Sequence, residues 1–312
     1  MGAVRYPAVD LGRVGIWTPT LDGVPAAEAG RLAAEVEAMG YGALWYPEVA
    51  GRDAMVNAAL LLAATGSLKL CSGIASIWAR DALAAACAHK TIEEAFPGRF
   101  LLGLGVSHAP AVEDLRGQSY DRPFSTMVAY LDAMDAAPYF ALAPVTEPQR
   151  ALAALGPRML ALAAERGAGA HPYLVPVEHT PVARATLDEA AAGVGRPRPL
   201  LAPEQACVLE TDPAEARRIA RDHMARYLAL PNYTNNLRRL GWGDADLDGG
   251  GSDRLVDAIV AWGTVDAIAA RVRAHLEAGA DHVCIQLLPA DGRTVPVDGW
   301  RTLAPTLTTM PA

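Results

Sequence analysis

Strand-like and helix-like segments alternate along the whole chain, and this alternation restricts the possible folds more than any other feature. Apolar runs such as Val14–Thr18, Ala43–Pro47 and Phe100–Val106 predict strands, and each precedes a segment with helical periodicity. Strands that alternate with helices pair in parallel, and helices then cover the sheet. About eight such strands are expected, and most are continuous apolar runs, as in a sheet buried on both faces.

Two architectures share this alternation, namely a closed (β/α)8 barrel and an open doubly wound sheet. The number of strands favours the barrel, and no G-x-G-x-x-G sequence follows the first strand, which weakens the case for a dinucleotide-binding open sheet. We therefore expect an α/β protein with a single TIM-barrel domain over residues 1–312. Insertion loops are expected at about 108–122, 137–149 and 229–252, and residues 265–278 are expected to form the last full helix.

Composition excludes several classes of function. The net charge of −8, without a clustered basic face, argues against a nucleic-acid partner. No apolar run approaches the roughly 18 to 20 residues that a membrane helix needs, and the first ten residues do not have the layout of a signal peptide. The four cysteines form no C-x-x-C pair, which predicts buried thiols rather than disulfides or a metal site. We expect a cytoplasmic protein without membrane, nucleic-acid or metal partners.

The chemistry of such a barrel takes place where its strands end. The predicted strand ends combine glycine, aromatic and polar residues, which suits a flat heterocycle that needs close approach to the backbone. They include Trp17, Glu48, Gly73–Ser76, Gly105–His108, Leu155–Arg158, His171–Tyr173, Glu204 and Gln286.

Six short segments are characteristic as a set. They are Cys71-Ser72-Gly73-Ile74, Trp78-Ala79-Arg80-Asp81, Pro97-Gly98-Arg99-Phe100, Ala154 to Met159, Gly169-Ala170-His171-Pro172 and Gly279 to Ile285. Together they resemble the luciferase-like monooxygenase superfamily, in particular its actinobacterial branch of oxidoreductases that use the deazaflavin coenzyme F-420. The resemblance extends over nearly the whole chain, and it implies a bacterial-luciferase-like barrel with F-420 as cofactor, or FMN as the alternative.

The resemblance also implies where a cofactor would bind. In the family the third strand ends in a bulge with a non-prolyl cis peptide behind the ring, which here would join Gly73 to Ile74 and continue through Ala75 and Ser76. The end of the fourth strand, Gly105-Val106-Ser107, would contact the ring or its side chain. These residues are the predicted ring site.

A helix that begins near Pro157 would present free backbone N–H groups, and Arg158 would add a full charge. Gly156, Pro157 and Arg158 are therefore predicted to hold the cofactor phosphate, and the preceding Leu155 is also predicted to contact the cofactor. The alternative is that Arg158 is an ordinary surface arginine.

Four residues are candidates for acid–base catalysis: Glu48, His108, His171 and His179. A histidine at position 108 could move protons near neutral pH, or it could be a loop side chain in solvent. Relatives carry a histidine directly after the residue that corresponds to Glu48, but this chain has Val49 there, which puts the sugar-phosphate chemistry of one related branch in doubt. His171 either faces the pocket or packs in the core.

Three functions remain open. The first is hydride transfer between an unidentified small organic substrate and F-420. The second is a luciferase-type monooxygenase that uses reduced FMN and O2. The third is a barrel that binds flavin, or nothing, without catalysis, since a fold does not fix a function. The resemblance also implies a homodimer.

Overall fold

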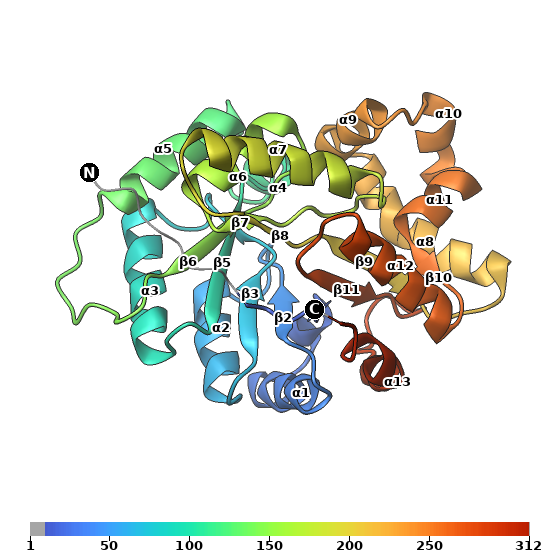
Figure 1. Cartoon of the computed structure of the whole chain (residues 1–312), viewed down its shortest axis with the longest axis horizontal. Helices are drawn as coiled ribbons and strands as arrows, with labels where there is room; N and C mark the ends of the chain where they lie inside the picture. The colour runs from blue at the N-terminus through green and yellow to red at the C-terminus, as the bar shows by residue number, and fades with distance from the viewer. Residues whose placement is uncertain (1–9, 312) are drawn as a thin grey trace.

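The computed structural model describes residues 10–311. A curled parallel sheet forms the centre of the molecule and helices pack around it (Figure 1). Neighbouring strands pair in parallel in the order of the chain. The strands along this order are β1 (Val14–Trp17), β2 (Ala43–Tyr46), β3 (Lys69–Ser72), β5 (Phe100–Gly105), β6 (Gln149–Leu152), β7 (Gly169–Ala170), β8 (Leu200–Leu201), β9 (Glu204–Val208) and β11 (Val283–Leu287).

The sheet closes on itself through residues 200–208, where one strand was expected. Two short strands, β8 and β9, stand there with Pro203 between them, which lacks a backbone N–H. β8 pairs with β7, whereas β9 pairs with β11, and β11 pairs with β1. The N–H of Glu204 also donates to the carbonyl of Pro172, at 2.9 Å. Counted over the described residues, the ring has eight strand positions, and the predicted TIM barrel is confirmed.

Two further short strands pair with the carboxyl ends of strands of the ring. β4 (Ala75–Ser76) pairs with β5, and β10 (Ala261–Trp262) pairs with β9. β4 directly follows the peptide bond between Gly73 and Ile74, so that the chain leaves β3, bends and continues along β5.

The outer helices follow their strands as the sequence pattern predicts. Asp53 and Asp81 begin α2 and α3, and each carboxylate accepts hydrogen bonds from backbone N–H groups of the first turn. The long helices are α1 (Ala26–Ala38), α2 (Ala54–Ala63), α3 (Ala82–Ala95), α5 (Pro123–Asp135), α6 (Pro157–Arg166), α7 (His179–Gly193), α8 (Pro213–Leu228), α12 (Val265–Glu277) and α13 (Val297–Leu307). No helix among the described residues is long and apolar enough to cross a membrane.

The helix α13 corrects the expectation that residues 265–278 form the last full helix. Its sequence contains Gly299 and Pro305, which disfavour a helix in isolation. Burial stabilises it instead, because Trp300, Leu303 and Leu307 are fully buried against the rest of the core.

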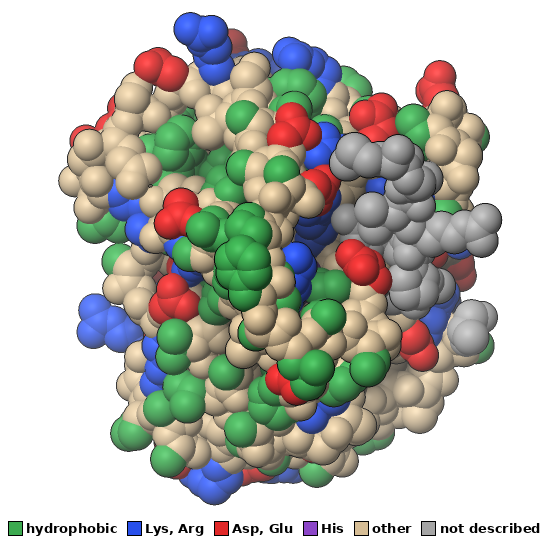
Figure 2. Space-filling view, turned by 90° about the vertical axis from the view of Figure 1, so that its left-hand side faces the viewer, with side chains coloured by type: hydrophobic (Ala, Val, Ile, Leu, Met, Phe, Trp, Pro, Cys, Tyr) green, Lys and Arg blue, Asp and Glu red, His purple; other side chains and the backbone are tan. Residues whose placement is uncertain are grey.

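The insertions differ in structure. Residues 108–122 contain α4 (Ala109–Glu113), and residues 229–252 contain α9 (Pro231–Arg239), α10 (Asp244–Leu247) and the short 3-10 helix η2 (Asp248–Gly250), with α11 (Asp253–Ile259) following. Residues 137–148 form neither helix nor strand and extend from the side of the molecule beside α3. Figure 2 views this side, where hydrophobic side chains gather among charged ones, and Phe140 is 97% exposed.

The apolar core has two parts, because side chains of a strand alternate between its faces. On β2, Leu44 and Tyr46 pack outward against the helices, whereas Ala43 and Trp45 belong to the cluster inside the barrel. Large indoles fit inside because other positions facing the interior carry glycine. A Cβ atom at Gly73, for example, would stand 2.5 Å from the indole nitrogen of Trp17.

A candidate ligand site at the mouth of the barrel

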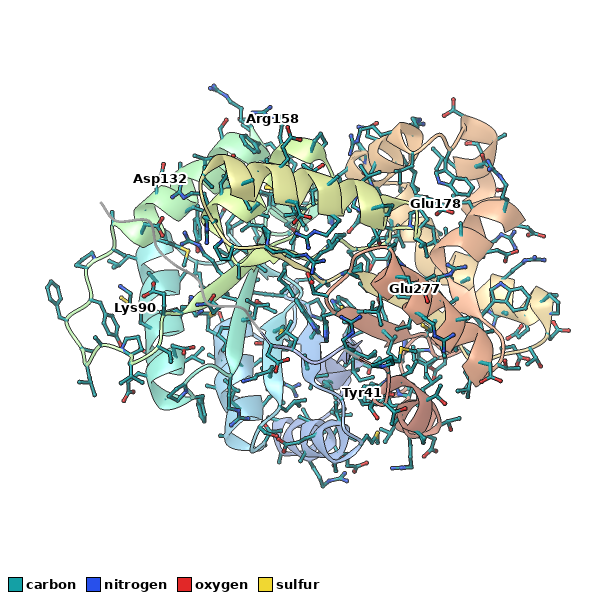
Figure 3. The ribbon with its side chains drawn as sticks, in the orientation of Figure 1. Tyr41, Lys90, Asp132, Arg158, Glu178 and Glu277 are labelled. Carbon is teal, nitrogen blue, oxygen red and sulfur yellow. The ribbon has the colours of Figure 1, made fainter. Side chains whose placement is uncertain are left out.

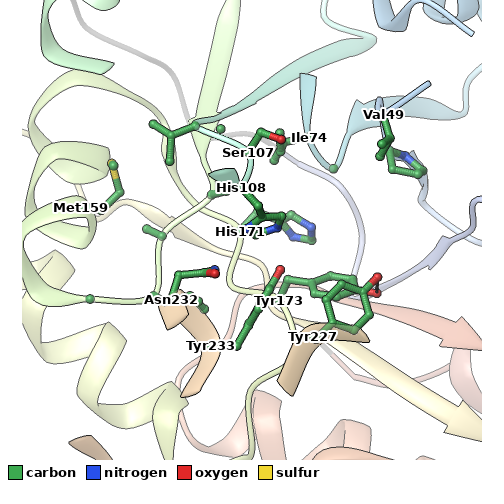
Figure 4. A pocket seen from close by; sticks show the side chains of 18 of the residues that line it. Val49, Ile74, Ser107, His108, Met159, His171, Tyr173, Tyr227, Asn232 and Tyr233 are labelled. Carbon is green, nitrogen blue, oxygen red and sulfur yellow. Dashed lines mark hydrogen bonds between the residues drawn. The ribbon is translucent and has the colours of Figure 1, made fainter. Parts of the chain in front are cut away.

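A cavity of about 420 Å³ opens at the carboxyl ends of the strands (Figure 4). Of the fifteen residues predicted to bind the cofactor or to act in catalysis, ten line it: Glu48, Gly73, Ile74, Gly105, Val106, Ser107, His108, Leu155, Gly156 and His171. The remaining five, Ala75, Ser76, Pro157, Arg158 and His179, are not among its lining residues. Sequence reasoning therefore located the cavity from the strand ends, although it did not find Tyr227, Asn232, Asn235 and Arg239, which also line it.

One wall of the cavity is built at the end of β3. The peptide bond between Gly73 and Ile74 is cis, which confirms that prediction. Gly73 lies so close to Trp17 that a Cβ atom would stand 2.5 Å from the indole nitrogen, and the indole N–H donates to the Gly73 carbonyl oxygen at 3.2 Å. A Cβ atom at Gly105 would stand 2.6 Å from Cγ1 of Ile74. These two glycines therefore leave a wall without side chains of its own, apart from that of Ile74.

Glu48 stands at the rim with both carboxylate oxygens engaged. Oε1 accepts the backbone N–H of Ala54 and Oε2 that of Ser76, both at 2.9 Å. Arg80 donates to both oxygens, with Nη1 3.0 Å from Oε2, and it also reaches Asp53 at 2.7 Å. Burial lowers the pKa of Arg80, but the two carboxylates outweigh it, and the net shift is upward. These contacts join β2, α2 and β4, and they favour a structural role for Glu48 over the acid predicted from sequence.

His108 faces the cavity from the start of α4. Its ring lies 5.4 Å from that of Tyr233, and the preceding residue, Ser107, has a left-handed backbone with φ of 57°. Burial lowers the pKa of His108 below its ordinary value, against a hydrogen bond with Asn232 that raises it. The imidazole is therefore neutral near pH 7, and in this form it can accept a proton.

His171 follows β7 and is almost completely buried, with 1% of its surface exposed. Its Nδ1 lies 2.8 Å from the carbonyl oxygen of Ala202, and its ring stacks on Trp45 with 4.4 Å between the ring centres. The side chain thus both packs in the interior and lines the cavity, so the two alternatives open in the sequence are not exclusive.

Three tyrosines gather on the side of the cavity opposite Ile74 (Figure 4). The hydroxyl of Tyr173 donates to Oε1 of Gln286 at 2.7 Å and lies 3.0 Å from that of Tyr227. The ring of Tyr227 meets that of Tyr233 edge to face at 5.3 Å. Tyr227 comes from α8 and Tyr233 from α9, so the region of the chain between β9 and β11 covers the mouth of the barrel. Nothing in the sequence pattern of α8 indicated that Tyr227 faces a cavity.

The positive charge at the cavity differs from the one predicted. The guanidinium of Arg158 lies 4.1 Å from the ring centre of Phe124, at the outer edge of the molecule (Figure 3). Arg239 of α9 lies beside Gly156 instead, with Nη2 3.2 Å from where a Cβ atom of Gly156 would stand. It bonds to Oδ1 of Asn236 at 3.0 Å and has no carboxylate partner among residues 10–311.

Gly156 is also the N-cap of α6, which has Pro157 in its first turn. Pro157 has no backbone N–H, and those of Met159 and Leu160 donate to the carbonyl of Gly156. Among the described residues, the N–H of Arg158 therefore remains in the first turn for a ligand, and the helix end carries a partial positive charge. Arg239, Asn232 and Asn235 line the cavity near this helix end. The arrangement can therefore bind an anion such as a phosphate.

Comparison with known proteins places this geometry in context. The sequence profile of the family described as luciferase-like monooxygenase matches residues 11–282. A protein of Mycobacterium tuberculosis, whose name assigns it to the coenzyme F-420-dependent oxidoreductases, is 30% identical over 171 residues. The match covers 45% of this chain and 49% of that protein, so it spans about half of the relative's length.

Solved structures share the fold over nearly their whole length. An F-420-dependent secondary alcohol dehydrogenase in complex with an F-420–acetone adduct has a TM-score of 0.77 at 14% identity, over 95% of this chain and 98% of that one. The coenzyme F-420-dependent tetrahydromethanopterin reductase of Methanopyrus kandleri has 0.70 at 17%, over 96% and 99%. The FMN-bound oxygenating constituent of 3,6-diketocamphane monooxygenase of Pseudomonas putida has 0.69 at 16%, over 95% and 98%. At these identities the likeness shows the fold alone.

Proposed function

Because this chain belongs to the luciferase-like monooxygenase family, we propose that it is an oxidoreductase that transfers a hydride between a small organic substrate and coenzyme F-420. The observation that carries the proposal is the pairing of two features in one cavity. A wall of glycine backbone stands at the end of β3 and β5, and the guanidinium of Arg239 stands beside Gly156, the N-cap of α6. The name of the mycobacterial relative supports the choice of F-420.

The residues of the cavity fit such a cofactor. The volume of about 420 Å³ lies within the usual range for ligand pockets. Gly73 and Gly105 keep the wall free of side chains that would block a flat ring. Arg239, which has no carboxylate partner among the described residues, would hold the phosphate together with the N-terminus of α6. When bound, the deazaflavin supplies a carbon, C5, that accepts or donates a hydride.

The protein's own groups would orient the substrate and handle the proton. Oxidation of a substrate hydroxyl removes a hydride from carbon and a proton from oxygen. His108 is neutral because of its burial and faces the cavity, so it is placed to accept that proton, and to return it in the reverse reaction. Tyr173, Tyr227 and Tyr233 form a largely apolar wall that would exclude water from the reacting atoms.

An FMN-dependent monooxygenase is the second candidate, because the FMN-bound camphane enzyme shares this fold and the anion site would accept either phosphate. Titration of the purified protein with F-420 and, separately, with FMN distinguishes the two by the change in cofactor fluorescence. We expect saturable binding of F-420. Tight binding of FMN without binding of F-420 would overturn the proposal, and failure to bind either would favour a non-catalytic barrel.

We also propose that residues 1–312 act as one domain and that two copies form a homodimer. Exposed apolar side chains on one side of the molecule support the second point: Val56, Leu60, Leu83 and Phe140 are between 46% and 97% exposed. These residues lie on α2, on α3 and in the loop 137–148. Light scattering after size exclusion would give the mass in solution, and a monomer at micromolar concentration would contradict the homodimer.

A further inference from the structure

The imidazole of His171 presents a hydrogen-bond acceptor that is not used within the protein. Its Nδ1 lies 2.8 Å from the carbonyl oxygen of Ala202, and a carbonyl can only accept. Nδ1 therefore carries the hydrogen, and in a neutral imidazole the other nitrogen, Nε2, then has a free lone pair. Nε2 is buried and has no hydrogen-bond partner among the described residues.

The ring is fixed in this state. Stacking on Trp45, at an angle of 20° between the rings, together with the bond to Ala202, leaves the imidazole little freedom to rotate. Burial lowers the pKa of His171 to about 4, against the bond to Ala202, which raises it. The ring is therefore uncharged near pH 7, and Nε2 acts as an acceptor rather than as an acid.

A second histidine shows what a satisfied ring looks like in the same barrel. His282 also contacts Trp45, with 6.0 Å between the ring centres, and its Nδ1 lies 2.8 Å from the carbonyl oxygen of Gly12. Its Nε2, however, accepts the indole N–H of Trp45 at 3.1 Å. Both histidines thus contact Trp45 and bond a backbone carbonyl through Nδ1, but of the two only Nε2 of His282 has a donor among the described residues.

The place of the free nitrogen indicates what would supply the donor. His171 lines the cavity together with Gly73, and a Cβ atom at Gly73 would lie 3.0 Å from Nε2. Glycine at that position therefore keeps the way between Nε2 and the cavity wall clear. A buried polar atom without a partner is unfavourable, so a ligand in the cavity that donates a hydrogen bond to Nε2 would relieve that cost.

We propose that Nε2 of His171 accepts a hydrogen bond from the ring system of the bound cofactor, which makes His171 a cofactor-positioning residue. The inference rests on the proposed function. The donor is an N–H or O–H on the edge of the ring. Both F-420 and FMN carry a ring N–H, whereas only F-420 carries a phenolic hydroxyl, in a position where FMN has a methyl group. If the phenolic hydroxyl is the donor, His171 would also select F-420 over FMN.

Two substitutions separate the roles of the two nitrogens. His171→Asn keeps an N–H where Nδ1 stands, for the bond to Ala202, but it removes the acceptor. His171→Gln places an amide oxygen near the position of Nε2. His282→Asn is the matched control, because it makes the same change in the same interior at a ring that is satisfied within the protein. Dissociation constants for F-420 and FMN, measured by fluorescence titration, and melting temperatures would be compared for all variants.

We expect His171→Asn to weaken F-420 binding by roughly tenfold, the loss of one buried hydrogen bond, and His171→Gln to recover part of that loss. His282→Asn should lower the melting temperature and leave affinity unchanged. Equal losses for F-420 and FMN would assign the ring N–H as donor, whereas a loss for F-420 alone would assign the hydroxyl. Unchanged affinities in His171→Asn, or a loss no larger than in His282→Asn, would overturn the inference.

A measurement on the unaltered protein covers the case in which the variants do not fold. In protein labelled with 15N-histidine, the Nε2 resonance of His171 should move when F-420 is added, and that of His282 should stay in place. If F-420 binds and both resonances stay in place, the inference fails while the proposed function stands. If the wild-type protein binds neither cofactor, it is the proposed function that fails.

Discussion

Arg80 donates hydrogen bonds to both carboxylate oxygens of Glu48 at the rim of the cavity, and the two side chains are 11% and 5% exposed. Removal of one partner of a buried ion pair leaves the other charge without compensation. We expect Glu48→Gln to lower the free energy of unfolding by about 3 kcal/mol, the lower end of the usual range for a broken buried pair. The loss stays at that end because Asp53 still pairs with Arg80. Urea denaturation would measure the loss.

The matched control is Asp53→Asn, which removes the exposed partner and retains a good helix N-cap. We expect this change to cost less than about 1 kcal/mol. A Glu48→Gln variant with wild-type stability but a much lower turnover would contradict the structural role and restore Glu48 as the acid.

Arg239 is expected to contribute most of the phosphate affinity. Arg239→Gln should weaken binding of F-420 and FMN by roughly 10- to 100-fold, and the remaining binding should depend less on salt concentration. Riboflavin, which has no phosphate, should bind both forms equally. Arg158→Gln should bind F-420 like the wild-type protein, because that guanidinium lies on Phe124. The reverse result, with Arg158 important and Arg239 dispensable, would mean that the phosphate binds elsewhere.

Two glycines of β5 should respond differently to alanine. A Cβ atom at Gly103 would meet the backbone oxygen of Ser72, which cannot move without distortion of the sheet. Gly103→Ala should therefore lower the free energy of unfolding by about 3 kcal/mol or more. At Gly105 the Cβ atom would meet side chains instead, that of Ile74 at 2.6 Å and, less closely, that of Ala153 at 3.3 Å. Gly105→Ala should fold, displace Ile74 and weaken F-420 binding by roughly tenfold. Melting curves and cofactor titrations of the two variants would test this prediction. Equal losses of stability in both variants would contradict it.

Glu204 should make stability depend on pH. Burial raises the pKa of Glu204 from 4.5 to about 8, against a hydrogen bond from the N–H of Leu174, which lowers it. Between these two values the folded protein holds a proton that the unfolded chain has lost. This contribution to stability is therefore complete below pH 4.5 and decreases as the pH rises toward 8.

Glu204→Gln removes that titration and keeps the size of the side chain. The stability of the variant relative to wild type should rise with pH across this window, by about 1.4 kcal/mol per pH unit at most. The difference between the two proteins is the informative quantity, because the buried histidines titrate in both. Glu94→Gln, an exposed control, should show no such trend. A constant difference from pH 5 to pH 8 would contradict the raised pKa of Glu204.

Local sequence was sufficient for the features that depend on short segments. Buried parallel strands are apolar runs, and Asp53 and Asp81 mark helix starts, because the physics of both is local. The cis peptide at Gly73 followed from resemblance, and the structure confirms it.

Features that depend on distant segments could not be predicted in this way. Glu48 and Arg80 are 32 positions apart, so their ion pair is visible only in the fold. Arg239 lies in an insertion, and no periodicity indicates that this insertion turns back over the barrel mouth. Arg158 stands at the predicted helix start, but its side chain lies on Phe124 rather than at the cavity. α13 forms because burial of Trp300 and its neighbours outweighs a poor helical sequence.

The short helix α9 carries two functions that are usually found on separate elements. Arg239 at its end reaches the anion site, while Asn232 and Tyr233 at its start line the cavity near His108. A phosphate bound at one end would hold in place the surface that receives the substrate at the other. Turnover should then follow a compulsory order, with the coenzyme entering first and leaving last, and initial rates under product inhibition would show that order.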